Sequence, residues 1–346
     1  MMSSKLVSVL MVTHNDAKVL PQCLESLHQQ DYPSIECIIV DNASTDDTRL
    51  LLTSFKGVHQ VVFNETNRGF AASQNQALRY AQGDWILLLN PDVILSRGFV
   101  TQLVAAAETD PAIGMASGKL LRWIPGANPP LSNIIDSTGI FFRKNLRHLD
   151  RGSEEVDRGQ SDQIAYVFGV TGAAALHRRR MVEEVSVMGE FLDESFFLCR
   201  DDADLAWRAQ LMGWSCIYTP QAVGWHVRRV TPSRFRELPL VVNWHSVKNR
   251  FMMRAKNASA LLYLRLLLPV TWRDCLILGY ALLVDQRLLS AFTYLWAHRK
   301  EIRAKRNWIQ ARRSVADDVL MKWFSNHPVS FPSALPGRPA HFKGDR

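Results

Sequence analysis

Residues 36–46 read Glu-Cys-Ile-Ile-Val-Asp-Asn-Ala-Ser-Thr-Asp, a short apolar run that ends in a polar turn with two carboxylates. An apolar run of this length, bounded by turn residues, is typical of a buried β-strand. Residues 7–13, Val-Ser-Val-Leu-Met-Val-Thr, form the same kind of run. Between the two runs, residues 18–29 carry apolar side chains at helical spacing, so this part of the chain predicts strand, helix and strand.

The alternation of strand and helix continues to residue 89. It predicts an α/β fold with a mostly parallel sheet covered by helices. In such sheets ligands bind beyond the carboxyl ends of the strands. Asp41, Asp46 and Asp92 each follow a predicted strand, so we expect a site at that edge. The further elements are expected at residues 47–55 (helix), 58–63 (strand), 71–81 (helix) and 85–89 (strand).

The rest of the chain divides by composition. Residues 122–165 are rich in proline, glycine, asparagine and charge, which favours a long loop or an irregular excursion. Strands and one strongly patterned helix are expected over residues 166–235, and long apolar and basic helices follow. We therefore expect an α/β domain over residues 1–235, a basic amphipathic helical region over residues 236–325 and a disordered tail over residues 326–346.

Charge is unevenly distributed along the chain. Residues 1–235 hold 22 Lys and Arg against 26 Asp and Glu, whereas residues 236–346 hold 19 against 7, which together give the net charge of +8. The acidic part can hold a cation, and the basic part can lie on an anionic surface. Five cysteines without a C-x-x-C pair, and an N-terminus that starts in a strand instead of a secretory signal, indicate a reducing cytoplasm.

Two polar clusters at strand ends are candidates for binding a nucleotide and a metal. A carboxylate such as Asp41 can accept hydrogen bonds from a nucleobase or a ribose hydroxyl, although the same turn also fits simple capping. Asp92 can hold Mg²⁺ or Mn²⁺ against a diphosphate, because these cations bind carboxylate and phosphate oxygens. The alternative at Asp92 is a strand-ending turn favoured by Pro91.

A third cluster, Asp201-Asp202-Ala203-Asp204, places three carboxylates within four residues. Crowded carboxylates raise each other's pKa, which is typical of functional sites, although aspartates are also favoured in the first turn of a helix. His226 follows a further predicted strand. It is a candidate ligand for Mn²⁺ or another transition ion, or else a structural histidine.

In their order, these pieces resemble the family 2 glycosyltransferases with the GT-A fold, and within them the rhamnosyltransferase-like branch. The likeness spans roughly residues 5–235. The matching pieces are Val12-Thr13-His14-Asn15, Val40 to Asp46, Asn67 to Ala72, Leu88 to Asp92, Gly172 to Leu176 with Arg178-Arg179, Phe191 to Phe197, Asp201 to Leu205, Arg208, Gly213-Trp214 and His226.

The resemblance implies a GT-A catalytic domain, a Rossmann-like sheet with flanking helices. It implies inverting transfer of a sugar from a nucleotide diphosphate donor, with dTDP-rhamnose favoured, to a saccharide or lipid-linked saccharide in cell-surface polysaccharide synthesis. It further implies Asp202 as the catalytic base, and Asp92 with His226 as ligands of Mg²⁺ or Mn²⁺. The other implied site residues are Thr13, Asn15, Asp41, Ser44, Arg68, Gly69 and Asn90 for the donor, and Gly172, Asp201, Asp204, Arg208 and Trp214 on the acceptor side.

The chain departs from the family pattern at several positions. Asn90 stands where the first Asp of the D-x-D motif is usual, a variant that also occurs in the rhamnosyl branch. Asp201 replaces the usual Glu, His14 a common Tyr, and Gln74 a usual Asn. Because one anionic ligand is missing at Asn90, we expect weak metal binding without donor.

Other functions stay open. Galactofuranose, glucose or N-acetylglucosamine are alternative donor sugars, and a non-catalytic nucleotide-sugar binding module is an alternative of another class, which the presence of Asp202 disfavours. A sugar nucleotidyltransferase or a Rossmann dehydrogenase would carry glycines after the first strand, where Thr13 to Ala17 has none. No aromatic-interleaved basic segment or recognised motif indicates nucleic-acid binding.

The basic C-terminal region predicts a membrane surface as partner. The longest uncharged pieces of residues 258–297 are ten residues each, half of the ~20 needed to span a bilayer. The strongly basic residues 298–309 follow, and such a helix suits anionic headgroups. We therefore expect a peripheral protein on the cytoplasmic face of the membrane; the alternative is that these helices pack on the catalytic domain or form a homodimer interface.

Overall fold

The computed structural model describes residues 5–125, 131–228 and 239–334. Most of its strands belong to one mixed sheet. The strands are β1 (Val7–Thr13), β2 (Ile35–Asn42), β3 (Gln60–Asn64), β4 (Trp85–Leu89), β5 (Val93–Leu95), β6 (Ile113–Trp123), β7 (Leu131–Ser137), β8 (Ile140–Phe142), β9 (His148–Asp150), β10 (Ala165–Val167), β11 (Ala174–Arg178) and β12 (Ser215–His226).

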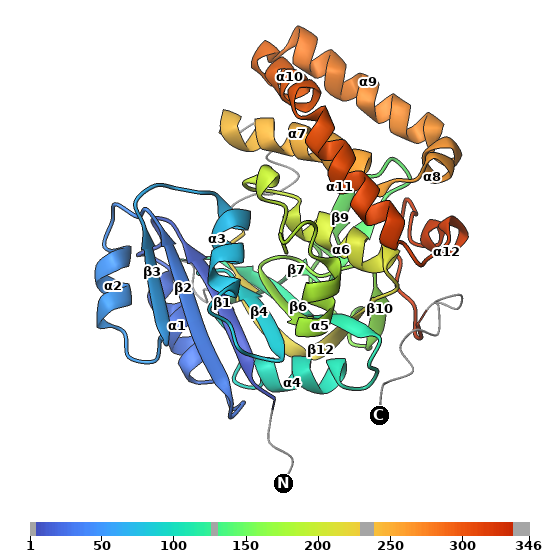
Figure 1. Cartoon of the computed structure of the whole chain (residues 1–346). Coiled ribbons are helices and arrows are strands. Elements are labelled where there is room, and N and C mark those ends of the chain that lie inside the picture. Colours follow the sequence, from blue (N-terminus) through green and yellow to red (C-terminus); the bar gives the residue numbers. More distant parts are fainter. Residues whose placement is uncertain (1–4, 126–130, 229–238, 335–346) are drawn as a thin grey trace.

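The strand order is β10-β12-β6-β11-β4-β1-β2-β3, with β5 paired to β12 and β7 paired to β6 (Figure 1). Strands β3, β2, β1 and β4 are parallel, as their helical crossovers predict, and β6 and β12 are also parallel. Strand β11 lies antiparallel between β4 and β6. The expected α/β sheet with flanking helices is therefore confirmed.

Helices cover both faces of the sheet. In β1, Val7, Val9 and Met11 join one hydrophobic cluster, while Leu10 and Val12 join the other, because successive side chains of a strand point to opposite faces. The first cluster is covered by α1 (Leu20–His28), α2 (Thr48–Ser54) and α4 (Phe99–Ala107), and the second by α3 (Phe70–Leu78), α5 (Arg179–Val185) and α6 (Asp201–Leu211).

The segment 122–165 is more regular than its composition suggests. Strand β6 reaches Trp123, β7 returns beside it, and β8 and β9 form a separate two-stranded sheet. Ile135, Ile140 and Phe142 are buried, so apolar residues spaced between the polar ones hold these short strands on the core. The expectation of a long loop or irregular excursion is thus wrong where β7, β8 and β9 lie, whereas residues 151–164 contain no strand or helix.

The C-terminal region is helical, as expected, and Figure 1 shows it on one side of the sheet domain. No helix in the described ranges is long and apolar enough to cross a membrane. The helices are α7 (Leu240–Asn257), α8 (Ala260–Arg265), α9 (Leu267–Leu283), α10 (Ser290–Ala297), α11 (Arg299–Arg312) and α12 (Asp317–Met321), and two short 3₁₀ turns are η1 (Glu194–Phe196) and η3 (Gln286–Leu289).

The C-terminal helices and the sheet domain share one hydrophobic core. Met252, Ile309 and Trp323 belong to the same cluster as Leu10 of β1. The tail expected to be disordered from residue 326 is also partly ordered, because Phe331 exchanges two backbone hydrogen bonds with Tyr166, at 2.7 and 2.9 Å. Residues 335–346 of that tail lie outside the described residues.

A buried ion cluster joins the two parts of the chain. The Asp193 carboxylate, just before η1, accepts hydrogen bonds from Lys256 of α7 and from Lys305 of α11, the latter at 2.7 Å. All three side chains are nearly inaccessible to solvent, with exposures of 2, 1 and 5%. Burial opposes ionisation of Asp193, but the two lysines outweigh it and lower the pKa of this carboxyl.

We expect Asp193→Asn to lower the free energy of unfolding by about 3 kcal/mol, because the buried ammonium groups of Lys256 and Lys305 lose their anionic partner. Urea denaturation followed by circular dichroism measures the change. The exposed ion pair between Arg265 and Asp318 is the control, and Asp318→Asn should cost less than about 1 kcal/mol. Because the folded pKa of Asp193 is lowered, the difference from wild type should be full above pH ~4 and shrink on further acidification. Equal effects of the two variants would contradict the prediction.

Candidate active site

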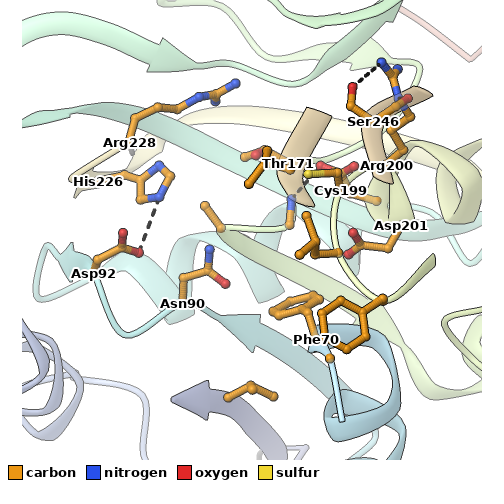
Figure 2. Close-up of a pocket in the computed structure, with 18 of the residues that line it drawn as sticks. Phe70, Asn90, Asp92, Thr171, Cys199, Arg200, Asp201, His226, Arg228 and Ser246 are labelled. Carbon is orange, nitrogen blue, oxygen red and sulfur yellow. Dashed lines mark hydrogen bonds and ion pairs between the residues drawn. The ribbon is translucent and has the colours of Figure 1, made fainter. Parts of the chain in front are cut away.

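A cavity of about 770 Å³ opens beyond the carboxyl ends of the sheet strands. Side chains from the sheet, from the 122–165 excursion and from the C-terminal helices line it, and Figure 2 shows part of this lining. The predicted site residues that the structure brings together in its wall are Gly69, Asn90, Asp92, Gly172, Asp201, Asp202 and His226.

Strand pairing places Asp92 beside His226. Asp92 lies between β4 and β5, and β5 pairs with the end of β12 so that Val93 is opposite His226. The backbone N–H of Val227 donates to the Asp92 carbonyl at 3.0 Å. The result is a distance of 3.4 Å between His226 Nε2 and Asp92 Oδ1, which Figure 2 marks.

Asp136 of β7 is a partner of His226 that the sequence did not reveal. Its Oδ2 lies 2.8 Å from His226 Nδ1, and the carboxylate is fully buried and paired with Arg122 of β6 at 2.9 Å. Burial disfavours the imidazolium, but Asp136 and Asp92 outweigh it and raise the pKa of His226 to about 9. A carboxylate on Nδ1 fixes the ring so that Nε2 points at Asp92.

Asp202 is held in the cavity wall by two backbone donors. It is the second residue of α6, and its Oδ2 accepts from Gly172 N at 3.2 Å while Oδ1 accepts from Ala203 N at 2.7 Å. Gly172 is near Asn90 because Asn90 N donates to Ala173 O at 2.8 Å. Burial, and then repulsion from Asp150, raises the pKa of Asp202.

The loop before α6 has a strained backbone. Phe197, Cys199 and Arg200 all have φ between 65° and 68°, a left-handed conformation that is costly for residues other than glycine. Gly69 is required opposite this loop, because a Cβ at this position would lie 2.4 Å from the Phe197 ring. Phe70 N donates to Phe197 O at 2.6 Å, so the loop is tied to α3.

Five predicted donor-binding residues lie next to the cavity without lining it. Asp41 is fully buried and accepts from Thr13 Oγ1 at 3.2 Å, Ser44 N at 3.1 Å and Arg49 Nε at 2.7 Å. Asn15 Oδ1 accepts from Thr45 N at 2.8 Å. These bonds shape the turns that present His14 and Asn42 to the cavity. The five residues are Thr13, Asn15, Asp41, Ser44 and Arg68.

Three predicted acceptor-side residues have structural roles instead. Asp204 is buried and pairs with Arg208 at 2.9 Å and with Lys256 at 3.1 Å. Arg208 also donates to two backbone carbonyls, and Trp214 is buried and donates to Glu184 at 3.1 Å. The helical spacing of α6 points Asp204 and Arg208 into the core, and Trp214 is buried just after this helix, so none of the three lines the cavity.

The cavity contains a basic wall that the sequence did not predict. Arg147, His148 and Asp150 come from the excursion around β9, Arg200 from the strained loop and Arg273 from α9. Arg228, just after β12, forms an ion pair with Asp150. These residues lie outside the quoted motifs, and only Arg273 belongs to the region after residue 235 whose positive net charge the sequence showed.

Comparison with known proteins finds similarity to one family over part of the chain. Residues 8–148 match the family model described as Glycosyl transferase family 2. An uncharacterised glycosyltransferase, YfnE of Bacillus subtilis, is 28% identical over 203 residues, or 57% of this chain and 45% of the relative. A PGL/p-HBAD biosynthesis glycosyltransferase of Mycobacterium bovis is 28% identical over 42% of this chain and 58% of its own length. The chain thus spans about half the length of these relatives.

Solved structures show the same fold at low sequence identity. The mannosyltransferase PcManGT of Pyrobaculum calidifontis, in complex with GDP-Man and Mn²⁺, has a TM-score of 0.52 at 19% identity, over 90% of this chain and 86% of its own. S. aureus TarS has a TM-score of 0.52 at 16% identity, over 89% of this chain and 53% of its own. This likeness supports the GT-A fold and the added C-terminal helices.

Proposed function

We propose that this chain, in which residues 8–148 match the glycosyl transferase family 2 model, transfers a sugar from a nucleoside diphosphate donor to an acceptor hydroxyl with inversion. The observation that carries the proposal is that one cavity holds both an acid–histidine pair, Asp92 and His226, and a separate carboxylate, Asp202. The acceptor we propose is a saccharide or lipid-linked saccharide in polysaccharide synthesis. A relative supports this class, since poly-β-1,6-N-acetyl-D-glucosamine synthase of Staphylococcus epidermidis is 21% identical over 84% of this chain.

Asp202 is the base in this proposal. As the acceptor oxygen attacks the anomeric carbon, Asp202 takes its proton, and the bond from that carbon to the diphosphate breaks with its electron pair on the leaving oxygen. Attack from the face opposite the leaving group inverts the anomeric carbon. The raised pKa of Asp202 strengthens it as a base, and the bonds from Gly172 and Ala203 keep it in place.

The residues at Asp92 fit a divalent cation. His226 Nε2 and Asp92 Oδ1 point at one another, and Asp136 on Nδ1 is the carboxylate partner usual for a metal-binding histidine. Because only a neutral imidazole nitrogen binds a metal, the cation would displace the Nε2 proton that the raised pKa of His226 otherwise retains. In the described part of the chain no three His, Cys, Asp or Glu side chains group into a metal site. Mg²⁺ or Mn²⁺ would therefore take its remaining ligands from phosphate oxygens and water, and would supply charge neutralisation at the diphosphate.

For the donor we propose dTDP-rhamnose, on the Asn90-Pro91-Asp92 variant and the Gly172 to Leu176 and Phe191 to Phe197 segments. Nucleotide release from dTDP-rhamnose, UDP-galactofuranose, UDP-glucose, UDP-N-acetylglucosamine and GDP-mannose identifies the donor and tests the transferase itself. No release from any of them with acceptor-containing membrane extract would contradict the proposed function.

We expect Asp202→Asn to lower kcat by about 10²- to 10⁴-fold and to leave the donor KM nearly unchanged, because a positioned base contributes about that factor. Sugar transfer and donor KM are measured on variants with wild-type melting curves. In the wild type, kcat/KM should fall on acidification with an apparent pKa above ~3.9, since the folded pKa of Asp202 is raised. Asp201→Asn is the matched comparison, and a larger loss there than at Asp202 would move the role of base to Asp201.

We expect Asp136→Asn to weaken activation by Mn²⁺ by about 10- to 100-fold while kcat at saturating Mn²⁺ changes less, because Asp136 orients His226. Activity is titrated with Mn²⁺ after EDTA treatment, and calorimetry without donor should show only weak binding. Asp157→Asn is the control, since Asp157 pairs with buried Lys119 outside the cavity. Full activity of metal-free protein, or equal effects of the two variants, would argue against the metal.

We also propose that the C-terminal region docks on an anionic membrane surface. The sequence predicts docking through the basic residues 298–309, whereas the structure favours the exposed apolar face of α8 to α10. Lys305 is buried on Asp193, and Arg306 donates to the carbonyls of Ala255 and Ala258, so these two cations are structural. The exposed apolar side chains lie on α8 to α10, which Figure 1 shows on the outer side of the helical region. They include Leu264, Leu268, Trp272, Leu276, Leu283 and Trp296.

Basic residues beside this face support a lipid partner. Arg299, Lys300 and Arg303 are exposed at the start of α11, next to Trp296 at the end of α10. Tryptophan and leucine with adjacent lysine and arginine suit the boundary between anionic headgroups and acyl chains. A second copy of the chain is the other occupant of such a face, which would make it a homodimer interface.

We expect the protein to float with anionic liposomes at low salt, and Leu268→Glu with Trp272→Ser to lose most of this binding. Leu268 and Trp272 are 83 and 69% exposed, so the variant should fold normally. Leu50→Glu on α2 is the control, because Leu50 is 68% exposed away from the region. If the protein did not float with the liposomes and formed a dimer that the double variant dissociates, this face would bind a second copy of the chain and not a membrane.

A further inference from the structure

Three arginines gather in the cavity wall on the side of the C-terminal helices. Arg147 precedes β9, Arg200 precedes α6 and Arg273 lies on α9, so three segments far apart in sequence supply them. Figure 2 shows Arg200 with Ser246 on the opposite side of the close-up from Asp92 and Asn90. The cluster therefore lies away from the proposed donor diphosphate.

Within the described residues the three arginines lack counter-ions. In the described ranges no carboxylate is within 4 Å of the Arg147, Arg200 or Arg273 guanidinium, and the buried Nε of Arg273 has no hydrogen-bond partner there. Two of the nearby acids pair with other arginines. Asp150 pairs with Arg228, and Asp274 with Arg250 and Arg254.

Arg200 is held in place by neutral groups. It donates to Ser246 of α7 twice, at 3.0 Å to the carbonyl and 3.1 Å to Oγ, and its Nη1 lies 2.8 Å from His148 Nδ1. Burial, and then the charge of Arg200, lowers the pKa of His148 well below its usual range. The His148 ring is therefore neutral and adds no charge of its own to the site.

The arginines repel one another. Burial and then Arg147 and Arg273 lower the pKa of Arg200 to about 10, and burial and then Arg273 lower that of Arg147. Unpaired buried charge costs free energy, so a fixed group of like charges that opens on a cavity indicates a site for a multivalent anion. Arginine is well suited to phosphate because its planar fork donates two parallel hydrogen bonds.

We propose that Arg147, Arg200 and Arg273 bind the phosphate or diphosphate that joins an acceptor saccharide to its lipid. This inference rests on the proposed function and names the acceptor's anionic group. Arg273 and the exposed Trp272 are neighbours on α9, so one helix presents a cation to the cavity and an apolar side chain to the outside. A lipid phosphate has the same arrangement, with its charge directly beside acyl chain.

The position of Asp202 fits this arrangement. It lines the same cavity, and its charge acts on Arg200. A saccharide whose phosphate lies on the arginines would extend toward Asp202, while the donor diphosphate lies at Asp92. The two anionic groups would then occupy separate ends of one cavity, with the hydroxyl to be deprotonated between them.

The test uses farnesyl phosphate as a probe for the site. Its binding to the full chain is measured by calorimetry with the nucleoside diphosphate of the active donor, or dTDP, and Mg²⁺ present in saturating amounts. Farnesol tests the apolar chain alone, and inorganic phosphate tests the charge alone. We expect farnesyl phosphate to bind at least about tenfold more tightly than either, with inorganic phosphate competing at high concentration.

Arg273→Gln and Arg147→Gln should each weaken farnesyl phosphate binding about tenfold, and Arg273→Lys should restore part of the loss. Arg79→Gln is the control, because Arg79 is exposed at the C-terminal end of α3, does not line the cavity and lies outside the proposed membrane face. Where turnover is found, the two Gln variants should raise the KM for a lipid-phosphate acceptor and change the donor KM less than twofold.

Three results would overturn the inference. Displacement of farnesyl phosphate by the nucleotide would assign the arginines to the donor. If inorganic phosphate bound as tightly as farnesyl phosphate, the ligand would not need a lipid. If both Gln variants bound farnesyl phosphate as the wild type does, with wild-type melting curves, the arginines would not be the binding site. Failure of the proposed function is a separate result: arginine-dependent binding without nucleotide release from any donor would leave the phosphate site and reject the transferase.

Discussion

The buried carboxylate of Asp193 is the constraint on which the cavity depends. It holds Lys256 of α7 and Lys305 of α11 against the sheet domain. Helix α7 also carries Ser246, which positions Arg200, and the adjoining α9 carries Arg273. Without this attachment the cavity would lose Arg273 and the contacts of Ser246 that position Arg200. We interpret the ion cluster as a source of specificity more than of net stability, because burying three charges costs much of what their attraction returns.

Strand and motif positions could be predicted where the relevant contacts are local. The apolar runs that end at Thr13, Asn42 and Leu89 are strands in the structure, and their ends lie at one edge of the sheet, as parallel pairing requires. The neighbourhood of Asp92, Asp202 and His226 also followed from the ordered motifs. These are the parts of the fold in which short-range pattern and tertiary structure agree.

Residues whose role depends on distant pairing could not be predicted. Asp136 is 90 residues from His226 and reaches it only because β7 pairs with β6, which pairs with β12. The motifs also did not distinguish residues of the cavity from residues of the core. Asp204 and Arg208 lie in the same sequence cluster as Asp202 but point into the core. Helical geometry separates them: successive residues of α6 face different sides, so a run of carboxylates divides between site and core.

The strained loop 197–200 shows why the boundary expected at residue 235 does not separate a complete site from an appendage. Its left-handed residues lie between Gly69 on one side and α7 on the other. The side-chain amide of Asn249 donates to the carbonyls of Phe196, Leu198 and Cys199, at 3.0, 2.7 and 2.8 Å. A strained conformation persists only where its surroundings over-determine it, and here half of those surroundings come from the C-terminal helices. Since Arg200 ends this loop and Asp202 follows it by two residues, the geometry proposed for the base and for the acceptor phosphate depends on residues from both sides of that boundary.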